Sequence, residues 1–241
     1  MNFAELKQMV ATSSNIVFFG GAGVSTESNI PDFRSAAGLY QAKNESAYTP
    51  EEVLSHSFFM KHTEDFYDFY KSKMIYKDAV PNQAHLALSS LERDGRLKAV
   101  ITQNIDGLHQ MAGNRNVMEL HGSVHRNYCM KCNKFFDLSY ILNIKNLVPR
   151  CDVCDSVVKP DVVLYEEGLD MELLFRAREC IANADILIVG GTSLTVNPAA
   201  GLVREYAGGK LILINKMPTP FDARADFLIN DSIGKVLGAL V

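Results

Sequence analysis

Four of the five cysteines stand in two Cys-x-x-Cys pairs, Cys129 with Cys132 and Cys151 with Cys154. Each pair suits a tight turn that presents two thiolates, and two such pairs fit the four corners of one tetrahedral zinc ion. Because four sulfur ligands leave no open coordination position, the predicted site is structural. The chain must therefore bring residues 129–132 and 151–154 together at one point. A redox-active pair or a disulfide framework is the alternative.

The composition is that of a globular protein with a large core, since 47% of the 241 residues are hydrophobic and 22% are charged. A net charge of −4 without a long Lys/Arg run argues against nucleic-acid binding and against an anionic membrane surface. We find no apolar run long enough for a membrane span and no signal-peptide block at the N-terminus. These features predict a cytoplasmic protein without membrane or nucleic-acid partners, and we expect a monomer.

Short apolar runs alternate with helical patterns along much of the chain. The runs are Ile16–Phe19, Ala99–Thr102, Val162–Tyr165, Ile186–Val189, Leu211–Ile214 and Phe227–Ile229. The helical patterns include Met171–Ala182, Pro198–Tyr206 and Ile233–Leu240. Continuous apolar strands between helices predict an α/β fold with a parallel sheet covered on both faces. Such a sheet binds ligands at the carboxyl ends of its strands.

Two regions interrupt this alternation. Residues 35–80 carry an aromatic-rich helical pattern without a clear strand, and residues 123–160 carry the paired cysteines. We predict that they form one smaller domain, helical in 35–80 and zinc-binding in 123–160. The remaining residues, 1–34, 81–122 and 161–241, would form a Rossmann-like domain into which the smaller domain is inserted. A cleft between the two domains is the natural place for an active site.

The first predicted strand runs into the glycine-rich stretch Gly20-Gly21-Ala22-Gly23-Val24-Ser25-Thr26. Glycines after a buried strand let backbone N–H groups approach a pyrophosphate at a helix N-terminus. Thr26 occupies the place of the third glycine in the G-x-G-x-x-G fingerprint, so a plain strand-to-helix turn is an alternative. Asn215, which closes the run Leu211–Ile214, is suited either to ribose hydroxyls or to ending a strand.

The segment Asn29–Ser35 follows this stretch. Arg34 is suited to pair with a phosphate, and Phe33 is suited to cover a flat ring. The alternative is an ordinary loop with a local ion pair between Asp32 and Arg34.

Polar side chains also follow two other predicted strands. Gln103, Asn104 and Asp106 come after Ala99–Thr102, and small residues come after Ile186–Val189. Loops at strand ends are where α/β folds place their chemistry, although Asn104 or Asp106 is equally suited to cap a helix.

His121, in the stretch Glu119-Leu120-His121-Gly122 before the cysteines, is a good candidate for a general base, although a lone histidine is more often structural. We expect the other histidines to be structural or at the surface: His56, His62, His85, His109 and His125.

The motifs occur in a distinctive order: GAGVSTESNIPDFRS, TQNIDGLHQMAG, ELHG, the paired cysteines, GTSL and LILIN. Over roughly residues 10–235 the chain resembles the sirtuins, a family of NAD-dependent protein-lysine deacylases, in their short bacterial form. The resemblance implies a Rossmann-like domain with a zinc-bearing small domain, and binding of NAD and an acyl-lysine peptide between them. It implies transfer of the acyl group from lysine to ADP-ribose, with release of nicotinamide and O-acetyl-ADP-ribose.

The resemblance also implies a role for individual residues. His121 matches the family's catalytic histidine, a general base on a ribose hydroxyl, with Asn104 and Asp106 as further catalytic residues. Together with these three, it implies NAD contacts from Ala22, Gly23, Thr26, Phe33, Arg34, Gln103, Ile105, Thr192, Ser193, Asn215 and Ile233. A peptide bound as an added strand would contact Val163, Leu164, Tyr165, Glu167, Thr195, Val196 and Asn197.

Three departures from the family pattern affect these expectations. Asn29 stands where many sirtuins have Gly, which concerns only the local turn. Glu166 replaces the Gly of Phe-Gly-Glu, and we expect its charge to favour basic residues beside the acyl-lysine. The stretch Tyr67–Tyr70 lacks the Arg of the Tyr-x-x-Arg that removes succinyl groups, which favours acetyl and other neutral acyl groups.

Two rival functions differ in their chemistry. A protein mono-ADP-ribosyltransferase would use the same NAD site but leave ADP-ribose on the protein. A non-catalytic NAD- or zinc-binding module would explain the glycines and cysteines, but it would leave Gln103, Asn104, Asp106 and His121 without a role.

Overall fold

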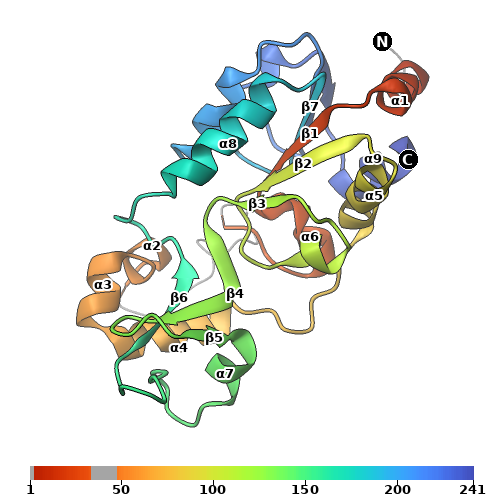
Figure 1. Cartoon of the computed structure of the whole chain (residues 1–241). Helices are drawn as coiled ribbons and strands as arrows, with labels where there is room; N and C mark the ends of the chain where they lie inside the picture. The colour runs from red at the N-terminus through yellow and green to blue at the C-terminus, as the bar shows by residue number, and fades with distance from the viewer. Residues whose placement is uncertain (1–2, 34–47) are drawn as a thin grey trace.

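The computed structural model describes residues 3–33 and 48–241. The prediction that Arg34 binds NAD therefore lies outside the described residues. Figure 1 shows two parts, one built on a six-stranded sheet and a smaller one built on a three-stranded sheet. Within the described ranges, every helix is too short or too polar to cross a membrane.

The larger part is a fully parallel sheet with the strand order β3-β2-β1-β7-β8-β9. Its strands are β1 (Ile16–Gly20), β2 (Leu97–Thr102), β3 (Val117–Glu119), β7 (Ile186–Gly190), β8 (Leu211–Ile214) and β9 (Phe227–Ile229). Five of the six correspond to predicted runs, which confirms the α/β fold class. The edge strand β3 has only three residues and gave no recognisable pattern in the sequence.

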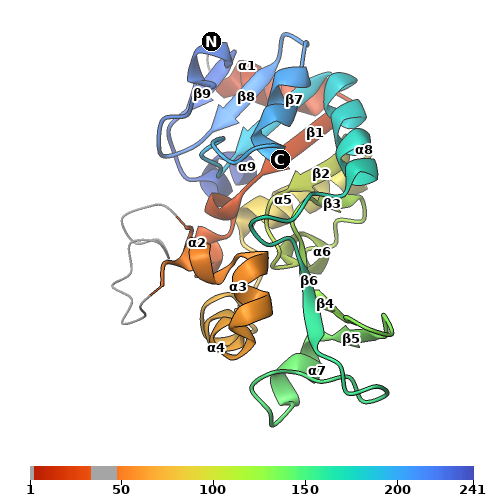
Figure 2. The same ribbon diagram turned by 90° about the vertical axis from the view of Figure 1, so that its left-hand side faces the viewer.

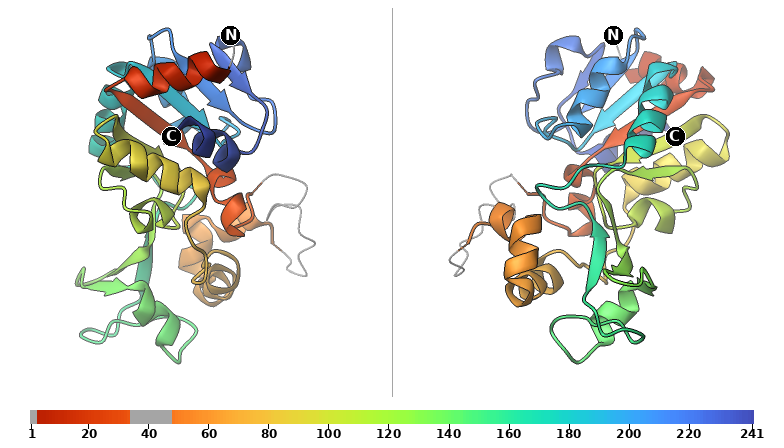
Figure 3. Two further views of the ribbon diagram at one scale, coloured as in Figure 1. Left: turned by 90° about the vertical axis from the view of Figure 1, so that its right-hand side faces the viewer. Right: turned by 60° about the vertical axis from the view of Figure 1, so that its left-hand side comes forward.

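Helices cover both faces of this sheet, as the continuous apolar strands predict. On β1, Val17 and Phe19 pack on the face covered by α8 (Met171–Ala182), whereas Ile16 and Phe18 pack on the opposite face. That second face is covered by three helices, which lie together in the left view of Figure 3: α1 (Phe3–Thr12), α5 (Gln83–Arg93) and α9 (Ile233–Leu240). Each large apolar side chain buried here contributes about 1.5–3 kcal/mol, so the sheet forms a rigid base for the loops at its edge.

The predicted strand Val162–Tyr165 is wrong. The strand in this region is β6 (Val158–Val162), and it belongs to an antiparallel sheet with the order β5-β4-β6. Val162 and Leu164 bury their side chains in the core of the smaller part, which explains an apolar run outside the large sheet. The pattern Pro198–Tyr206 forms a 3-10 helix, η3 (Ala199–Glu205), rather than an α-helix.

The smaller part joins the two regions that interrupt the alternation. Its elements are α2 (Pro50–Val53), α3 (His56–Lys61), α4 (Thr63–Lys73), β4 (Gly122–Cys129), β5 (Phe135–Asp137), β6 and α7 (Leu138–Asn143). In Figure 2 the helices α2–α4 lie beside β4 and β6. Phe66, Tyr67 and Tyr70 of α4 share one core with Val124 and Val158, and the Tyr67 hydroxyl donates to the Val158 carbonyl. Aromatic side chains of α4 therefore fasten the helices to the cysteine-bearing strands.

Two histidines predicted to be structural are buried against each other. The rings of His85 in α5 and His109 in α6 (Leu108–Met111) have centroids 4.7 Å apart, and both side chains are buried. The Asn82 N–H donates to Nδ1 of His85, but Nε2 of His85 and both nitrogens of His109 lack a partner among the described residues. Burial lowers the pKa of His85 to about 4, against the opposing charge of Asp106. Burial, reinforced by His85, lowers the pKa of His109 to about 3, so both rings are neutral near pH 7.

We expect this pair to make the fold sensitive to acid. Below about pH 6.5, the ordinary pKa of histidine, the unfolded chain binds protons that the folded chain takes up only near pH 4 and pH 3. As the pH falls through that window, each histidine lowers the free energy of unfolding by about 1.4 kcal/mol per pH unit. Above the window, the two histidines leave the free energy of unfolding independent of pH. Urea unfolding between about pH 7.5 and pH 5 measures this slope. His109→Leu should reduce the slope by roughly one proton; an unchanged slope contradicts the explanation.

Candidate active site

The strand order places the site at β1, where the sequence of strands reverses. β2 and β3 lie on one side of β1, and β7, β8 and β9 lie on the other. In doubly wound sheets, ligands bind outside the carboxyl ends of the strands at this point. Most predicted site residues follow directly after β1, β2, β3, β7 or β8 and so gather along this edge of the sheet.

The turns after β1 and β7 touch backbone to backbone. The Gly23 N–H donates to the Gly191 carbonyl over 2.7 Å, and a Cβ on Gly23 would lie 2.7 Å from the Gly191 Cα. Gly191 has φ +61°, which also favours glycine. Among the described residues, no protein acceptor takes the N–H groups of Ala22, Thr192 or Ser193. Free N–H groups at two adjacent strand ends fit the diphosphate of a dinucleotide.

Gln103 connects the three central strands at this edge. Its N–H donates to the Gly20 carbonyl over 3.0 Å, and its Oε1 accepts from the Thr192 hydroxyl over 2.9 Å. Thr192 is nearly buried. The predicted cofactor residues Gln103 and Thr192 are therefore held against each other by the protein itself.

Asn104 and Asp106 are linked through Ser25, which the sequence reasoning did not single out. The Ser25 hydroxyl donates to Asp106 Oδ2 over 2.6 Å and accepts from Asn104 Nδ2 over 3.0 Å. The other carboxylate oxygen of Asp106 accepts the Leu108 N–H over 2.9 Å, at the first residue of α6. Ser25 is 1% exposed, and its only sequence signal is its place in the glycine-rich stretch. The network fixes both polar side chains beside the turn after β1.

His121 follows β3, and its Nδ1 lies 2.9 Å from the Gln103 carbonyl. A carbonyl only accepts, so Nδ1 carries the proton and Nε2 is left as the acceptor of the ring. Burial lowers the pKa of His121 below its ordinary value, and the bond to the Gln103 carbonyl partly opposes this. A neutral imidazole with an available Nε2 is the form that a general base needs near pH 7.

Gly122 leaves no space beside this histidine. Its φ is +78°, and an added Cβ would collide with the Asp161 carbonyl across the β4–β6 pair. The turn from β3 into β4 is therefore as tight as the backbone allows.

The remaining predicted NAD contacts spread along the sheet. Asn215 ends β8, where its N–H donates to the Ile229 carbonyl and its Nδ2 to the Met217 carbonyl. Ile233 begins α9 and packs onto Gly190, on the opposite side of β1 from His121. Three further residues lie elsewhere: Thr26 begins the 3-10 helix η2 (Thr26–Ser28), and Phe33 and Ile105 pack against the core of the smaller part.

The predicted peptide-binding segment Val163–Tyr165 already uses its N–H groups within the protein. Val163 donates to the His121 carbonyl over 3.0 Å, Leu164 to the Glu167 carboxylate over 2.8 Å and Tyr165 to the Leu54 carbonyl over 2.9 Å. The segment is therefore attached both to the histidine and to the helices of the smaller part. In the other predicted peptide-binding segment, the Thr195 hydroxyl lies 2.8 Å from that of Ser193, and the Val196 carbonyl accepts the Ala200 N–H. Asn197 precedes a cis proline.

Two departures from the family pattern have a local structural explanation. Asn29 and Glu166 both have positive φ, 62° and 75°, at positions where glycine is usual. The Glu166 carboxylate accepts from the N–H and the hydroxyl of Ser57, each over 2.9 Å, at the start of α3. These bonds fix the position of the carboxylate but leave its negative charge, so the expectation that Glu166 favours basic flanking residues stays a prediction.

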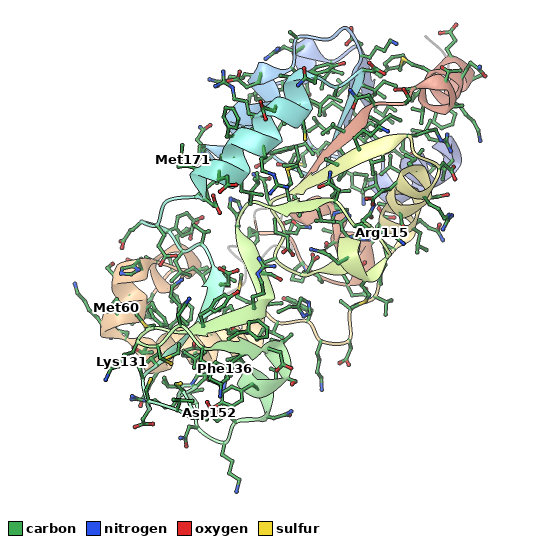
Figure 4. All side chains as sticks on the ribbon, in the orientation of Figure 1. Met60, Arg115, Lys131, Phe136, Asp152 and Met171 are labelled. Atoms are coloured by element: carbon green, nitrogen blue, oxygen red, sulfur yellow. The ribbon has the colours of Figure 1, made fainter. Side chains whose placement is uncertain are left out.

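The four paired cysteines meet at the far end of the smaller part. All four sulfurs lie within 4.8 Å of one another, with 3.4 Å between Cys129 and Cys154 and 3.6 Å between Cys132 and Cys151. These separations are far longer than a disulfide of about 2.05 Å and near the roughly 3.8 Å edge of a tetrahedron with 2.3 Å zinc–sulfur bonds. In Figure 4, Lys131 and Asp152, which stand inside the two Cys-x-x-Cys turns, lie away from the six-stranded sheet. The donor set fits one structural zinc ion.

The parallel sheet, its glycine-rich turns at the reversal of strand order and the appended four-cysteine module define a dinucleotide-binding α/β protein with a metal-stabilised second part. The Sir2 family model matches residues 21–198, and the chain belongs to the Sir2 family.

A relative from Clostridium tetani, an NAD-dependent protein deacetylase, is 66% identical over 236 residues, covering 98% of this chain and 96% of the relative. Another, from Clostridium acetobutylicum and of the same name, is 62% identical over 98% of this chain and 97% of its own length. Among solved structures, a mutant Sir2 homologue in complex with ADP-ribose has a TM-score of 0.89 at 39% identity, covering 100% of this chain and 95% of that chain. A Sir2 protein with a p53 peptide and NAD+ has a TM-score of 0.85 at 38% identity, covering 100% of this chain and 97% of its own.

Proposed function

We propose that this chain is an NAD-dependent protein deacetylase, which transfers an acetyl group from lysine to ADP-ribose and releases nicotinamide and O-acetyl-ADP-ribose. The observation that carries the proposal is His121: burial keeps its ring neutral, and the bond from Nδ1 to the Gln103 carbonyl leaves Nε2 available for a proton. Relatives of 66% and 62% identity along nearly the whole chain bear the name of this activity.

The residues at the sheet edge have separate roles in binding NAD and in the reaction. NAD, when bound, supplies the ADP-ribose that accepts the acyl group and the nicotinamide that leaves. The free N–H groups after β1 and β7 bind the diphosphate, and Asn215 with Ile233 lines the adenosine side. Ser25 holds Asn104 and Asp106 for the nicotinamide ribose and the carboxamide. The Nε2 of His121 removes a proton from a ribose hydroxyl, which prepares that oxygen to take the acyl group.

The acyl-lysine peptide binds between two segments of the chain, Val163–Tyr165 with Glu167 and residues 195–197. On one side the N–H groups of Val163–Tyr165 are engaged internally, so the pairing uses their side chains and the backbone beyond Tyr165. On the other side it uses residues 195–197. Tyr67 and Tyr70, buried in the core of the smaller part, offer no cation for an acidic acyl group. The preferred acyl groups are therefore acetyl and other neutral ones.

The decisive experiment mixes the purified protein with an acetyl-lysine peptide, with and without NAD, and follows the products by mass spectrometry. We expect the peptide to lose its acetyl group only with NAD, with one nicotinamide and one O-acetyl-ADP-ribose per turnover. ADP-ribose left covalently on the protein or peptide would indicate the transferase instead. NAD binding without nicotinamide release would indicate a binding module and contradict the proposal.

Further parts of the proposal rest on the sequence. The domain division (1–34, 81–122 and 161–241 against 35–80 and 123–160) is supported by one core that combines Val53–Tyr70 with Val124–Val158, although Val162 and Leu164, which it assigns to the larger domain, pack in that core as well. A cytoplasmic location is supported by the metal-type cysteine spacing, and the absence of direct nucleic-acid binding by the net charge of −4. The monomeric state stays a prediction.

A further inference from the structure

The strand β4 contains a bulge next to the proposed active site. Ser123 pairs with Asp161 of β6, and Asn127 pairs with Pro160, the neighbour of Asp161. Residues 124–126 therefore have no partner on β6. A bulge bends its strand and redirects the side chains within it, and bulges are frequent beside active sites.

Two residues of the bulge, Val124 and His125, contact the loop after β2 that carries Asp106. The Val124 N–H donates to the Ile105 carbonyl over 3.0 Å, and Nε2 of His125 lies 3.0 Å from the Asp106 carbonyl. The His125 ring covers Gly107, where a Cβ would lie 2.7 Å from the ring. The third residue, Arg126, reaches two carboxylates on different strands.

The Arg126 guanidinium joins the last residue of β3 to β6. Its Nη1 lies 2.6 Å from Glu119 Oε2, and its Nε lies 2.7 Å from Asp161 Oδ2. Glu119 is 9% exposed, so its end of the interaction is shielded from solvent, whereas the side chains of Arg126 and Asp161 are 39% and 41% exposed. Two charge-assisted bonds from one planar group fix the distance between their acceptors.

The two carboxylates bracket the contact between the proposed base and the peptide-binding segment. Glu119 stands two residues before His121, and Asp161 stands two residues before Val163. The Val163 N–H donates to the His121 carbonyl over 3.0 Å. The bonds of Arg126 to Glu119 and Asp161 and the bond between Val163 and His121 therefore form a closed ring of contacts. This ring fixes the position of His121 relative to the peptide-binding segment.

We infer that Arg126 is a positioning residue for the deacylation step, an inference that rests on the proposed function. Without the two bonds, β3 and β6 move relative to each other, and His121 shifts relative to the bound acyl-lysine. Misplacement of about 1 Å at a reacting group costs up to roughly 10²-fold in rate. In the mechanism that the resemblance to the sirtuins implies, nicotinamide leaves before His121 takes its proton, so we expect nicotinamide release to depend little on the position of His121.

The test compares two reactions of the same enzyme: deacetylation of an acetyl-lysine peptide, and peptide-dependent exchange of labelled nicotinamide into NAD. We expect Arg126→Met to lower the deacetylation kcat about tenfold and to change nicotinamide exchange less than about twofold. Glu119→Gln/Arg126→Met removes the buried carboxylate that the single variant leaves unpaired, and it should show the same split with a melting temperature closer to that of the wild type.

Arg178→Met is the matched control, because it removes the 2.9 Å ion pair between Arg178 and Glu205 away from the site. It should leave both reactions unchanged. If Arg126→Met and the double variant keep wild-type kcat, or lose deacetylation and exchange in parallel, Arg126 is merely structural and the inference is wrong. A wild-type protein that deacetylates no peptide overturns the proposed function itself, and the inference with it.

Discussion

His121→Ala should lower the rate of deacetylation by about 10²–10⁴-fold, the usual contribution of a general base. The ring is held by one bond to the Gln103 carbonyl and contributes its Nε2 only to the proton transfer. We therefore expect the affinity for NAD to change little. Steady-state kinetics with an acetyl-lysine peptide and calorimetric titration of NAD separate the two effects.

The same histidine should set the acid limb of the pH–rate profile. A base works only when deprotonated, so kcat/KM should fall as the pH drops through the pKa of His121. Burial places that pKa below the ordinary histidine value, so activity should persist to more acidic pH than an exposed histidine would allow. His62→Ala, which removes a histidine of 43% side-chain exposure in the smaller part, is the matched control. Wild-type turnover in His121→Ala would refute the role of general base.

Removal of the metal should unfold the smaller part and abolish activity. Four thiolates packed within 4.8 Å repel one another unless a cation lies between them, and structural zinc sites contribute about 10–16 kcal/mol of apparent binding free energy. The cysteine turns share a core with α3 and α4, so loss of the ion should also release those helices. Hydrogen exchange after chelation should show lost protection in β4 and β6 and retained protection in β1 and β7.

Cysteine substitutions provide the control for this experiment. Cys132→Ser should reproduce the effect of chelation, because it removes one ligand. Cys180→Ser should not, since Cys180 lies on α8 outside the cluster, partly exposed. Unchanged melting and activity after complete metal removal, verified by elemental analysis, would contradict a structural role for zinc.

The large sheet was predictable because its central strands are buried on both sides. Ile16–Gly20 and Ile186–Gly190 are apolar throughout, a pattern that few other structures need. The same reasoning failed at Val162–Tyr165, since a short apolar run serves equally well as the core of a small module. The edge strand β3 has only three residues, which are too few to show a period in the sequence.

Site residues that belong to short sequence motifs were predictable. Site residues whose positions depend on contacts between distant segments were not. Gln103 and His121 are recognisable because polar residues directly follow apolar strands. Ser25, His125 and Arg126 gain their positions from pairing between separate segments, above all from the bulge in β4. A single sequence carries no signal for such a register, because a bulge depends on which strands lie beside it.

The crowding at Gly122 limits how this enzyme can be altered. No side chain fits there without pushing the Asp161 carbonyl aside, and the left-handed backbone adds a further cost for any other amino acid. A mutant library intended to change the accepted acyl group should therefore keep position 122 constant and place its diversity on the helices of the smaller part. Substrate scope can then be varied without disturbing the imidazole.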